Sequence, residues 1–256
     1  MDMVPKVNFY LEHKYTDVIV NNPENIVDGP AMYVANHLAF DDSLAIAAMY
    51  ANATGNPLRL GGKKEYFEGK GVKVLGIPMF GKTIQKFVIE TQQLSVSRDG
   101  DRKGTAQLVK DVKHLFSIGE SVLLHAEGTR SVDGRLNRFK YGAAAFAIKN
   151  SVPLAPVSVT YPKQSWLRKS VEVTFGEPLH PVDYGMEFRH FTLLPDGLVD
   201  AMAPRLMNQN ERIAAVTEIL EQRVAEMSGQ ERSGYYLDPY TKKLIIPEDL
   251  TKQLEK

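Results

Sequence analysis

The sequence predicts an α/β fold: a single domain with a mixed, largely parallel sheet flanked by helices. Short apolar runs of strand length alternate with longer segments of helical periodicity. Several of these runs are apolar throughout, as are strands buried on both faces of a parallel sheet. The 256 residues, 43% hydrophobic and 24% charged, suit one globular core. We expect the domain to span residues 1–227 and residues 228–256 to form a polar C-terminal tail.

The first expected elements are a strand, a turn, a second strand and a helix. Residues 15–21 and 31–35 have the apolar character of strands, and the segment between them is rich in Asn, Pro, Asp and Gly, which favour turns. Residues 41–53 form a mostly apolar run of helical length. Asp41 can serve as the N-cap of this helix, and Gly55 can end it.

Strands and helices continue to alternate beyond this helix. They begin with a βαβ unit, so functional loops should lie at the ends of the strands. The expected elements are, in order, a strand over 94–97, an amphipathic helix over 103–118, a strand over 121–125, a helix over 141–149, strands over 154–161 and 170–175, and a helix over 205–227.

Composition and charge narrow the classes of function. The 31 basic residues balance the 31 acidic ones, so no overall field draws the chain to nucleic acid, and any anion site must be local. The absence of cysteine removes disulfides, thiolate metal sites and a cysteine nucleophile. The longest apolar stretches, 43–53 and 142–148, are shorter than the roughly 20 residues that a membrane-spanning helix needs. We expect a cytoplasmic protein without a transmembrane segment.

A histidine and an aspartate mark the junction between the strand that ends at residue 35 and the next helix. Four residues separate His37 from Asp42. Five positions along one helix would put two side chains on different faces, so the pair can meet only if His37 precedes the helix and Asp42 lies in its first turn. Such a carboxylate fixes the histidine tautomer and raises its basicity, which suits a general base. A structural histidine at a strand end is the alternative.

A polar loop follows the apolar run Val122-Leu123-Leu124. In Glu127-Gly128-Thr129-Arg130-Ser131, a turn at glycine can expose backbone N–H groups, and arginine offers a fork that matches phosphate oxygens. The loop is therefore either a phosphate site or a turn with an exposed ion pair. Arg98, at the end of the expected strand 94–97, is another candidate phosphate ligand.

Other patterns in the sequence do not indicate a functional site. Residues 76–83 fit the phosphate-loop pattern GxxxxGK[ST], but Pro78 has no N–H to offer and large side chains crowd the turn. The chain has no GxSxG elbow of a serine hydrolase. The remaining histidines lack the spacing of metal ligands, so no metal site is expected.

In this order, the polar blocks resemble those of the glycerolipid and lysophospholipid acyltransferase family, which includes 1-acylglycerol-3-phosphate acyltransferases. Residues 36–42 are similar to the family's NHxxxxD block, Arg98 to the arginine of its second block, and residues 127–131 to its EGTR block. The match covers residues 15–175, which we take as the motif core of the domain. The resemblance implies a glycerol-3-phosphate acyltransferase-like fold and an O-acyltransferase activity.

The resemblance also implies a role for each residue. His37 would be the general base and Asp42 its orienting partner. The hydroxyl of the acceptor would attack the thioester directly, without a protein nucleophile, metal or cofactor, and a loop N–H would stabilise the oxyanion. The substrate-binding residues would be Lys63 (or Lys64, if the register shifts by one), Arg98, Glu127, Gly128, Thr129 and Arg130.

The implied reaction moves an acyl group from acyl-CoA or acyl-carrier protein to a lysophospholipid, foremost 1-acylglycerol 3-phosphate, at the cytosolic face of a membrane. The partners would be the lipid acceptor and the thioester donor, and not nucleic acid. Three alternatives stay open: acylation of glycerol 3-phosphate, acylation of a non-phosphorylated amino- or glycolipid, and a non-catalytic lipid- or acyl-carrier-binding module. Residues 152–157 resemble the fourth block and either wall an acyl pocket or form an ordinary buried strand.

The chain departs from the family pattern at several positions. Ala39 stands where a small hydroxyl residue is common, Ser97 where an acid is common, and His125-Ala126 where Phe-Pro is common. The helical pair that often precedes the first block looks absent, because only 35 residues precede Asn36. Two alternatives stay open: the chain is a domain excised from a longer protein, or it contacts lipid through exposed apolar residues, for instance Tyr66, Phe67, Ile77, Met79 and Phe80. The sequence carries no signal of oligomeric state.

Overall fold

The structure is a computed structural model of the chain, and it describes residues 4–70, 72–74, 77–79, 81–91, 93–96, 101–162, 169–180, 209–237 and 244–245. The helices in these ranges are α1 (Val4–Lys14), α2 (Asp42–Thr54), α3 (Lys64–Phe67), α4 (Gly81–Glu90), α5 (Arg102–Ser117), α6 (Gly142–Asn150) and α7 (Gln209–Ser228), with a 3-10 turn η1 (Pro23–Asn25). The strands are β1 (Asp17–Asn21), β2 (Met32–Ala35), β3 (Leu58–Lys63), β4 (Val72–Val74), β5 (Ile77–Met79), β6 (Leu94–Val96), β7 (Ser121–His125), β8 (Leu154–Thr160), β9 (Ser170–Phe175), β10 (Tyr236–Leu237) and β11 (Leu244–Ile245).

The described residues form one main sheet, whose strand order is β1-β9-β8-β2-β7-β3-β6. Every neighbouring pair in this sheet is parallel except β8 with β9, which is antiparallel. The predicted mixed, largely parallel sheet is therefore confirmed. β2 lies near its centre, where Met32 pairs with Leu154 of β8 on one side and with Val122 of β7 on the other. The loop after β2 thus starts from a fully buried strand.

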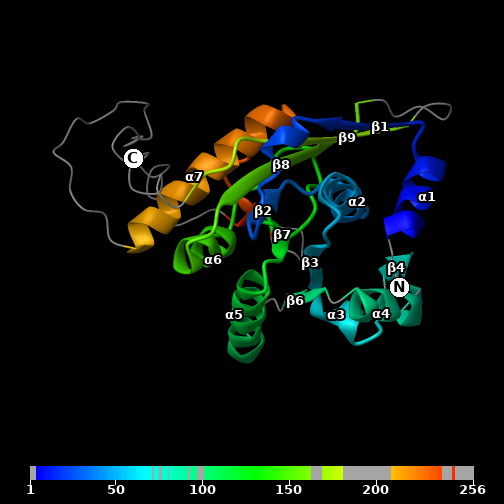
Figure 1. Ribbon diagram of the computed structural model, residues 1–256, viewed down its shortest axis with the longest axis horizontal. Coiled ribbons are helices and arrows are strands. Elements are labelled where there is room, and N and C mark those ends of the chain that lie inside the picture. Colours follow the sequence, from blue (N-terminus) through cyan, green and yellow to red (C-terminus); the bar gives the residue numbers. More distant parts are fainter. Residues whose placement is uncertain are drawn as a thin grey trace.

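Helices cover both faces of the sheet (Figure 1). Helices α5, α6 and α7 pack on one face, against side chains that include Met32 and Val122. Helices α1 and α2 pack on the opposite face, against Tyr33 and Val157. Because successive side chains of a strand point to opposite faces, β2 contributes alternately to the two cores.

Most predicted elements differ from the observed ones by only one or two residues at their ends, and the strands over 121–125 and 170–175 coincide with them. Gly55 ends α2 with a φ of 72°, which glycine adopts without strain. The sequence did not predict α1, α4 or β3. In β3, Gly61 and Gly62 interrupt the apolar alternation, and a Cβ at Gly61 would lie 2.5 Å from Cδ2 of Leu124. Close packing therefore requires glycine at residue 61, and this glycine breaks the apolar pattern from which the strand could have been predicted.

Part of the segment predicted as a C-terminal tail bonds to the loop that follows β7. Leu136 donates its N–H to the carbonyl of Glu231 (2.9 Å) and accepts from the N–H of Ser233 (2.8 Å). Arg138 donates its N–H to the carbonyl of Tyr235 (2.8 Å). The division of the chain at residue 227 stays a prediction, but residues 231–235 are joined to the domain.

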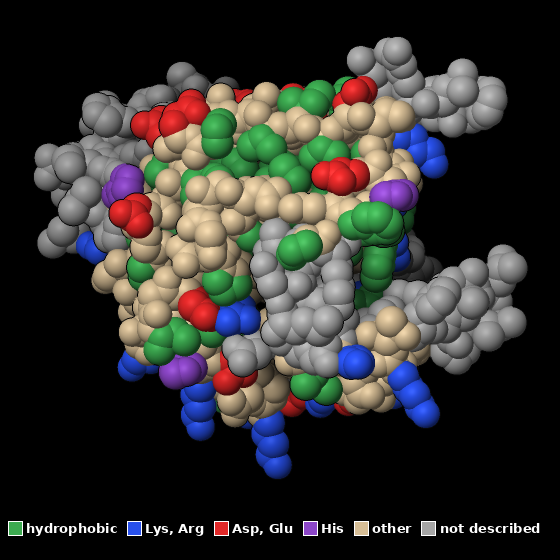
Figure 2. Space-filling view, turned by 45° about the vertical axis from the view of Figure 1, so that its right-hand side comes forward, with side chains coloured by type: hydrophobic (Ala, Val, Ile, Leu, Met, Phe, Trp, Pro, Cys, Tyr) green, Lys and Arg blue, Asp and Glu red, His purple; other side chains and the backbone are tan. Residues whose placement is uncertain are grey.

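The surface carries charges of both signs. Figure 2 shows basic and acidic side chains spread over one face, in keeping with the equal totals of 31 each. No helix among the described residues is both long and apolar enough to cross a bilayer. Of the residues expected to contact lipid, Tyr66 and Phe67 are half-buried, and the side chains at 77, 79 and 80 lie outside the described part.

Candidate active site

The candidate site lies where three adjacent parallel strands end. His37 follows β2, Glu127 follows β7, and Lys63 is the last residue of β3. Because the carboxyl ends of parallel strands meet at one edge of a sheet, the fold brings these predicted residues to a common place. Arg98 lies outside the described residues, so its predicted role as a phosphate ligand stays a prediction.

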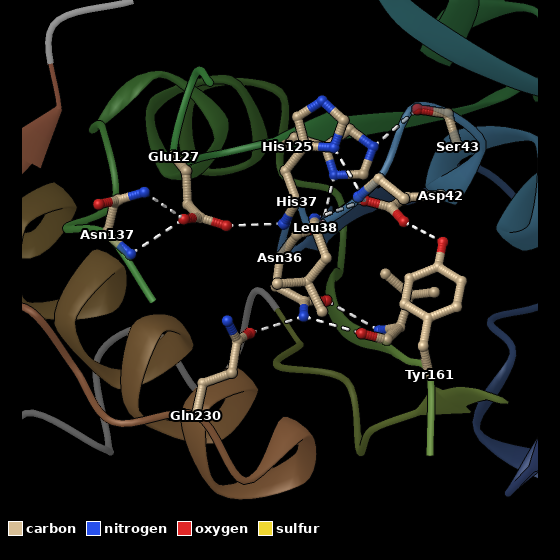
Figure 3. A network of polar contacts seen from close by, with 12 residues as sticks. Asn36, His37, Leu38, Asp42, Ser43, His125, Glu127, Asn137, Tyr161 and Gln230 are labelled. Atoms are coloured by element: carbon tan, nitrogen blue, oxygen red, sulfur yellow. Dashed lines mark hydrogen bonds and ion pairs between the residues drawn. The ribbon is translucent and has the colours of Figure 1, made fainter. Parts of the chain in front are cut away.

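His37 and Asp42 meet as the sequence predicts. Nδ1 of His37 lies 2.9 Å from Oδ2 of Asp42, which is the first residue of α2 (Figure 3). The same oxygen accepts from the backbone N–H groups of Leu38 (2.6 Å) and Ala39 (2.8 Å), so the tight turn before α2 is wrapped around the carboxylate. Since an ionised carboxylate only accepts, Nδ1 carries the ring proton and Nε2 can bind another.

Tyr161 holds the other oxygen of Asp42. Tyr161 is the first residue after β8 and lies 119 positions from Asp42 in the sequence. Its hydroxyl donates to Oδ1 of Asp42 (Figure 3). Asp42 is fully buried, and burial raises its pKa. The hydrogen bond from His37, the charge of its protonated form and the bond from Tyr161 outweigh burial, so the net pKa of Asp42 is lowered. Asp42 is therefore ionised at neutral pH, as an orienting partner must be.

Glu127 connects the second polar loop to the backbone of His37. Its Oε1 accepts the N–H of His37 at 2.6 Å, and its Oε2 accepts the backbone and side-chain N–H groups of Asn137 at 2.9 and 2.8 Å. The N–H of Ser131 in turn donates to the carbonyl of His37 (2.8 Å). Burial raises the pKa of Glu127 to about 8, although these N–H donors oppose the shift. Glu127 does not line the cavity described below, so its visible role is to shape the loop.

His125, the last residue of β7, lies between the two polar blocks. Its Nδ1 is 2.7 Å from the carbonyl oxygen of Asn36, and its Nε2 is 2.7 Å from Oγ of Ser43. Burial, followed by the neighbouring His37, lowers the pKa of His125 to about 3, so its ring is neutral at ordinary pH. The sequence showed this residue only as a departure from a usual phenylalanine. A polar ring at an aromatic position was the signal that could have identified it.

Asn36 and Gln230 are two further residues that the sequence did not single out as site residues. The side chain of Asn36 is buried and pairs twice with the backbone of Val159 in β8, accepting its N–H at 2.8 Å and donating to its carbonyl at 2.9 Å. Gln230 accepts from Asn36 (2.7 Å; Figure 3). It also donates to the carbonyl of Gly134 (2.7 Å), so it joins the loop after β2 to the loop after β7. Gln230 lies 194 positions from Asn36, and no local pattern announces this contact.

A cavity of about 580 Å³ lies beside His37 and His125. Much of its wall is apolar and is contributed by β3, α4, α5 and α6, for example through Leu60, Val88, Leu108 and Phe146. Such a wall suits an alkyl chain, while the histidine pair provides a polar end. The arrangement can therefore hold a long apolar group with its reactive end close to His37.

Cationic side chains gather at the same cavity. Among the described residues, Lys63, Arg130 and Lys140 line it. Lys64 is not among the lining residues and lies 3.2 Å from Asp101, so Lys63 stays the predicted substrate-binding residue of the two. The three cations could hold an anionic group such as a phosphate next to the base.

The remaining loop residues have different surroundings. Arg130 is exposed and forms no ion pair with another described residue, whereas Thr129 is buried and does not line the cavity. Gly128 has a φ of 71°, and a Cβ there would lie 2.9 Å from Nζ of Lys140. Glycine thus permits both the turn and the passage of Lys140 over it.

Residues 152–157 do not wall the cavity, because none of them is among its lining residues. They enter the central strand β8, where the side chains of Leu154 and Val157 belong to the cores on the two faces of the sheet. Of the two interpretations offered by the sequence, the buried strand is the correct one. β8 supports the site indirectly, through the backbone of Val159 and the position of Tyr161.

Comparison with known proteins gives consistent matches. The sequence model of the family named Acyltransferase matches residues 17–160. A chloroplastic 1-acyl-sn-glycerol-3-phosphate acyltransferase from Brassica napus is 31% identical over 133 residues, which are 52% of this chain and 33% of that protein. The protein of the same description from Bacillus subtilis is 30% identical over 172 residues, 66% of this chain and 67% of that protein.

A solved structure shares the fold. The 1-acyl-sn-glycerophosphate acyltransferase of Thermotoga maritima matches with a TM-score of 0.52 and 20% identity, over 88% of this chain and 79% of that one. The chain spans only about a third of the length of the plant relatives. Because the family match nevertheless covers more than half of its 256 residues, and the expected motif blocks lie within or next to that match, the chain belongs to the Acyltransferase family.

Proposed function

We propose that this chain transfers an acyl group from a thioester to the free hydroxyl of 1-acylglycerol 3-phosphate at a membrane surface. The observation that carries the proposal is the bond from Nδ1 of His37 to the ionised, buried Asp42, at a cavity that also presents Arg130. The relatives from Brassica napus and Bacillus subtilis are described as acting on this acceptor, which supports the same choice here.

In the proposed reaction, His37 acts as a general base. With Nδ1 committed to Asp42, Nε2 takes the proton of the acceptor hydroxyl while the oxygen attacks the thioester carbonyl. A C–O bond forms, the C–S bond then breaks, and the leaving thiolate recovers the proton from the imidazolium. General-base catalysis supplies about 10²–10⁴-fold, so holding the two substrates together must supply much of the rest.

The positive side chains at the cavity suit a phosphorylated acceptor. Arg130, Lys63 and Lys140 line the same space as His37, and a phosphate monoester carries up to two negative charges. Three positive side chains at one cavity favour an anionic acceptor over a neutral one. The phosphate therefore distinguishes the proposed acceptor from an amino- or glycolipid.

The apolar wall of the cavity would hold the acyl chain, and acyl-CoA and acyl-carrier protein would present the same thioester at its polar end. Phe40 lines the cavity and is nevertheless 47% exposed. Phe40 thus extends the apolar lining of the cavity to the solvent-exposed surface, and such an apolar entrance would admit a lipid from a membrane surface. On this basis we propose peripheral contact with the bilayer at the cavity.

Release of thiol from acyl-CoA by the purified protein tests the proposal. Separate reactions would contain lysophosphatidate, glycerol 3-phosphate, a neutral monoacylglycerol or no acceptor. Each would be repeated with acylated acyl-carrier protein as the donor. We expect release that depends on lysophosphatidate and disappears in His37→Ala. His13→Ala is the matched control, because His13 is an exposed histidine of α1 whose Nδ1 lies 2.7 Å from the carbonyl oxygen of Phe9 in the same helix.

The arms of this experiment separate the alternatives. Release with glycerol 3-phosphate alone, or with the neutral lipid, would replace the proposed acceptor. Binding of acyl-CoA without release in any arm and with either donor would favour a non-catalytic binding module and contradict the proposal.

A further inference from the structure

The ring of His37 lies face to face with a second histidine. The centroids of His37 and His125 are 4.1 Å apart, and the two ring planes differ by 16° (Figure 3). Both side chains line the cavity. The proposed base is therefore held at one edge by Asp42 and over its face by His125.

The hydrogen bonds of His125 define its tautomer. The carbonyl oxygen of Asn36 can only accept, so the ring nitrogen 2.7 Å from it, Nδ1, carries the proton. In a neutral imidazole the other nitrogen, Nε2, must then accept, and Oγ of Ser43 at 2.7 Å donates to it. With a bond at each nitrogen, the ring of His125 cannot turn about its own axis without breaking both.

We propose that His125 is a positioning residue for His37: a neutral ring, fixed by Asn36 and Ser43, against which the base stacks. This inference rests on the proposed function. The bond from Nδ1 to Asp42 constrains one edge of the His37 ring but leaves the ring able to tilt about that bond. A flat neighbour at 4.1 Å restricts the tilt and so directs Nε2.

A neutral neighbour also suits the charge that His37 gains. When His37 accepts a proton, a charged histidine against its face would repel the imidazolium, whereas the face of a neutral ring does not. Burial keeps the pKa of His125 near 3, which removes such repulsion throughout the ordinary pH range. Both the geometry and the charge state thus favour a positioning role.

Two substitutions at residue 125 separate this role from simple support of the fold. His125→Ala removes the stacking ring, and His125→Phe keeps a ring but loses both hydrogen bonds. We expect His125→Ala to lower kcat about 10- to 100-fold, since small displacements of a catalytic group have effects of this size, with KM changed less than about threefold. His125→Phe should recover most of this loss, to within about fivefold of the wild-type kcat. The matched control is His114→Ala, which replaces an exposed histidine of α5 and should keep the wild-type rate.

Nuclear magnetic resonance of the histidine side chains supplies a readout that does not depend on activity. In the wild-type protein, the nitrogen shifts of His125 should show the Nδ1–H tautomer and stay constant between about pH 5.5 and 8. His125→Ala should shift the ring resonances of His37, whereas His114→Ala should not. If no thiol is released with any acceptor, the proposed function fails, and these spectra still decide the geometry.

Three outcomes would overturn the inference. The first is a kcat for His125→Phe as low as that for His125→Ala in folded protein. The second is a His125 ring that titrates near the usual histidine pKa or carries its proton on Nε2. The third is a His37 spectrum that is unaffected by removal of the neighbouring ring.

Discussion

The substitution Asp42→Asn removes one charge from the proposed catalytic pair and leaves its shape nearly unchanged. At 2.9 Å, a carboxylate and an imidazolium attract by about 6 kcal/mol at an effective dielectric constant of about 20. This value corresponds to about 10⁴-fold in rate, and it is an upper limit because the amide oxygen can still accept the hydrogen bond. We therefore expect kcat of thioester-dependent acyl transfer to fall about 10²–10⁴-fold, with KM within about threefold.

The neighbouring Asp41 provides a matched control. It is also buried, but its carboxylate accepts from Lys14 (2.8 Å) and Tyr15 rather than from His37. Asp41→Asn should lower the free energy of unfolding, because it weakens a partly buried ion pair, and should leave kcat within about threefold of wild type. Initial rates of thiol release and urea unfolding would be measured for both variants. Equal losses of kcat in the two variants, or a normal kcat for Asp42→Asn, would refute the pairing of His37 with Asp42 as the source of basicity.

Three further predictions follow from the site. In steady-state assays, Arg130→Ala should raise the KM for lysophosphatidate about tenfold or more and leave the KM of the acyl donor unchanged. Arg135→Ala, at a residue of the same loop that pairs with Asp133 at 2.8 Å, should change neither KM. Gln230→Ala should lower the free energy of unfolding by about 1–2 kcal/mol and reduce kcat severalfold. Gln222→Ala removes an exposed hydrogen bond to Glu226 within α7 and should leave the urea midpoint and the rate unchanged. Between pH 3 and 6.5, His125 binds fewer protons in the folded chain than in the unfolded chain. The free energy of unfolding therefore decreases as pH falls through this window, by up to about 1.4 kcal/mol per pH unit. In urea unfolding measurements, His125→Phe should lack this contribution to the pH dependence.

The parts of the site that could be predicted from the sequence are those set by short-range rules. The order strand, histidine, turn, aspartate and helix required His37 and Asp42 to meet, since Asp42 could reach back only from the first turn of α2. Gly55 stops that helix for an equally local reason, its positive φ. The buried strands of the main sheet were visible as apolar runs of the right length.

The surroundings of the pair could not be predicted, because they depend on the order of strands in the sheet. Tyr161 reaches Asp42 only because β8 lies beside β2, and His125 reaches Asn36 because β7 lies on its other side. Gln230 arrives from a segment that the sequence presented as a polar tail. Each contact spans 89 residues or more, and apolar patterning specifies that a strand is buried without specifying its neighbours.

The pKa values of the two buried carboxylates of the site are shifted in opposite directions for a physical reason. Burial raises the pKa of both Asp42 and Glu127. Asp42 also receives the ring of His37, whose positive form attracts it, and its net pKa is lowered. The donors to Glu127 are uncharged amides, and its pKa stays at about 8. Asp42, which contacts the His37 ring, therefore carries a negative charge at neutral pH that matches an imidazolium there, while Glu127 fixes the loop through its N–H donors.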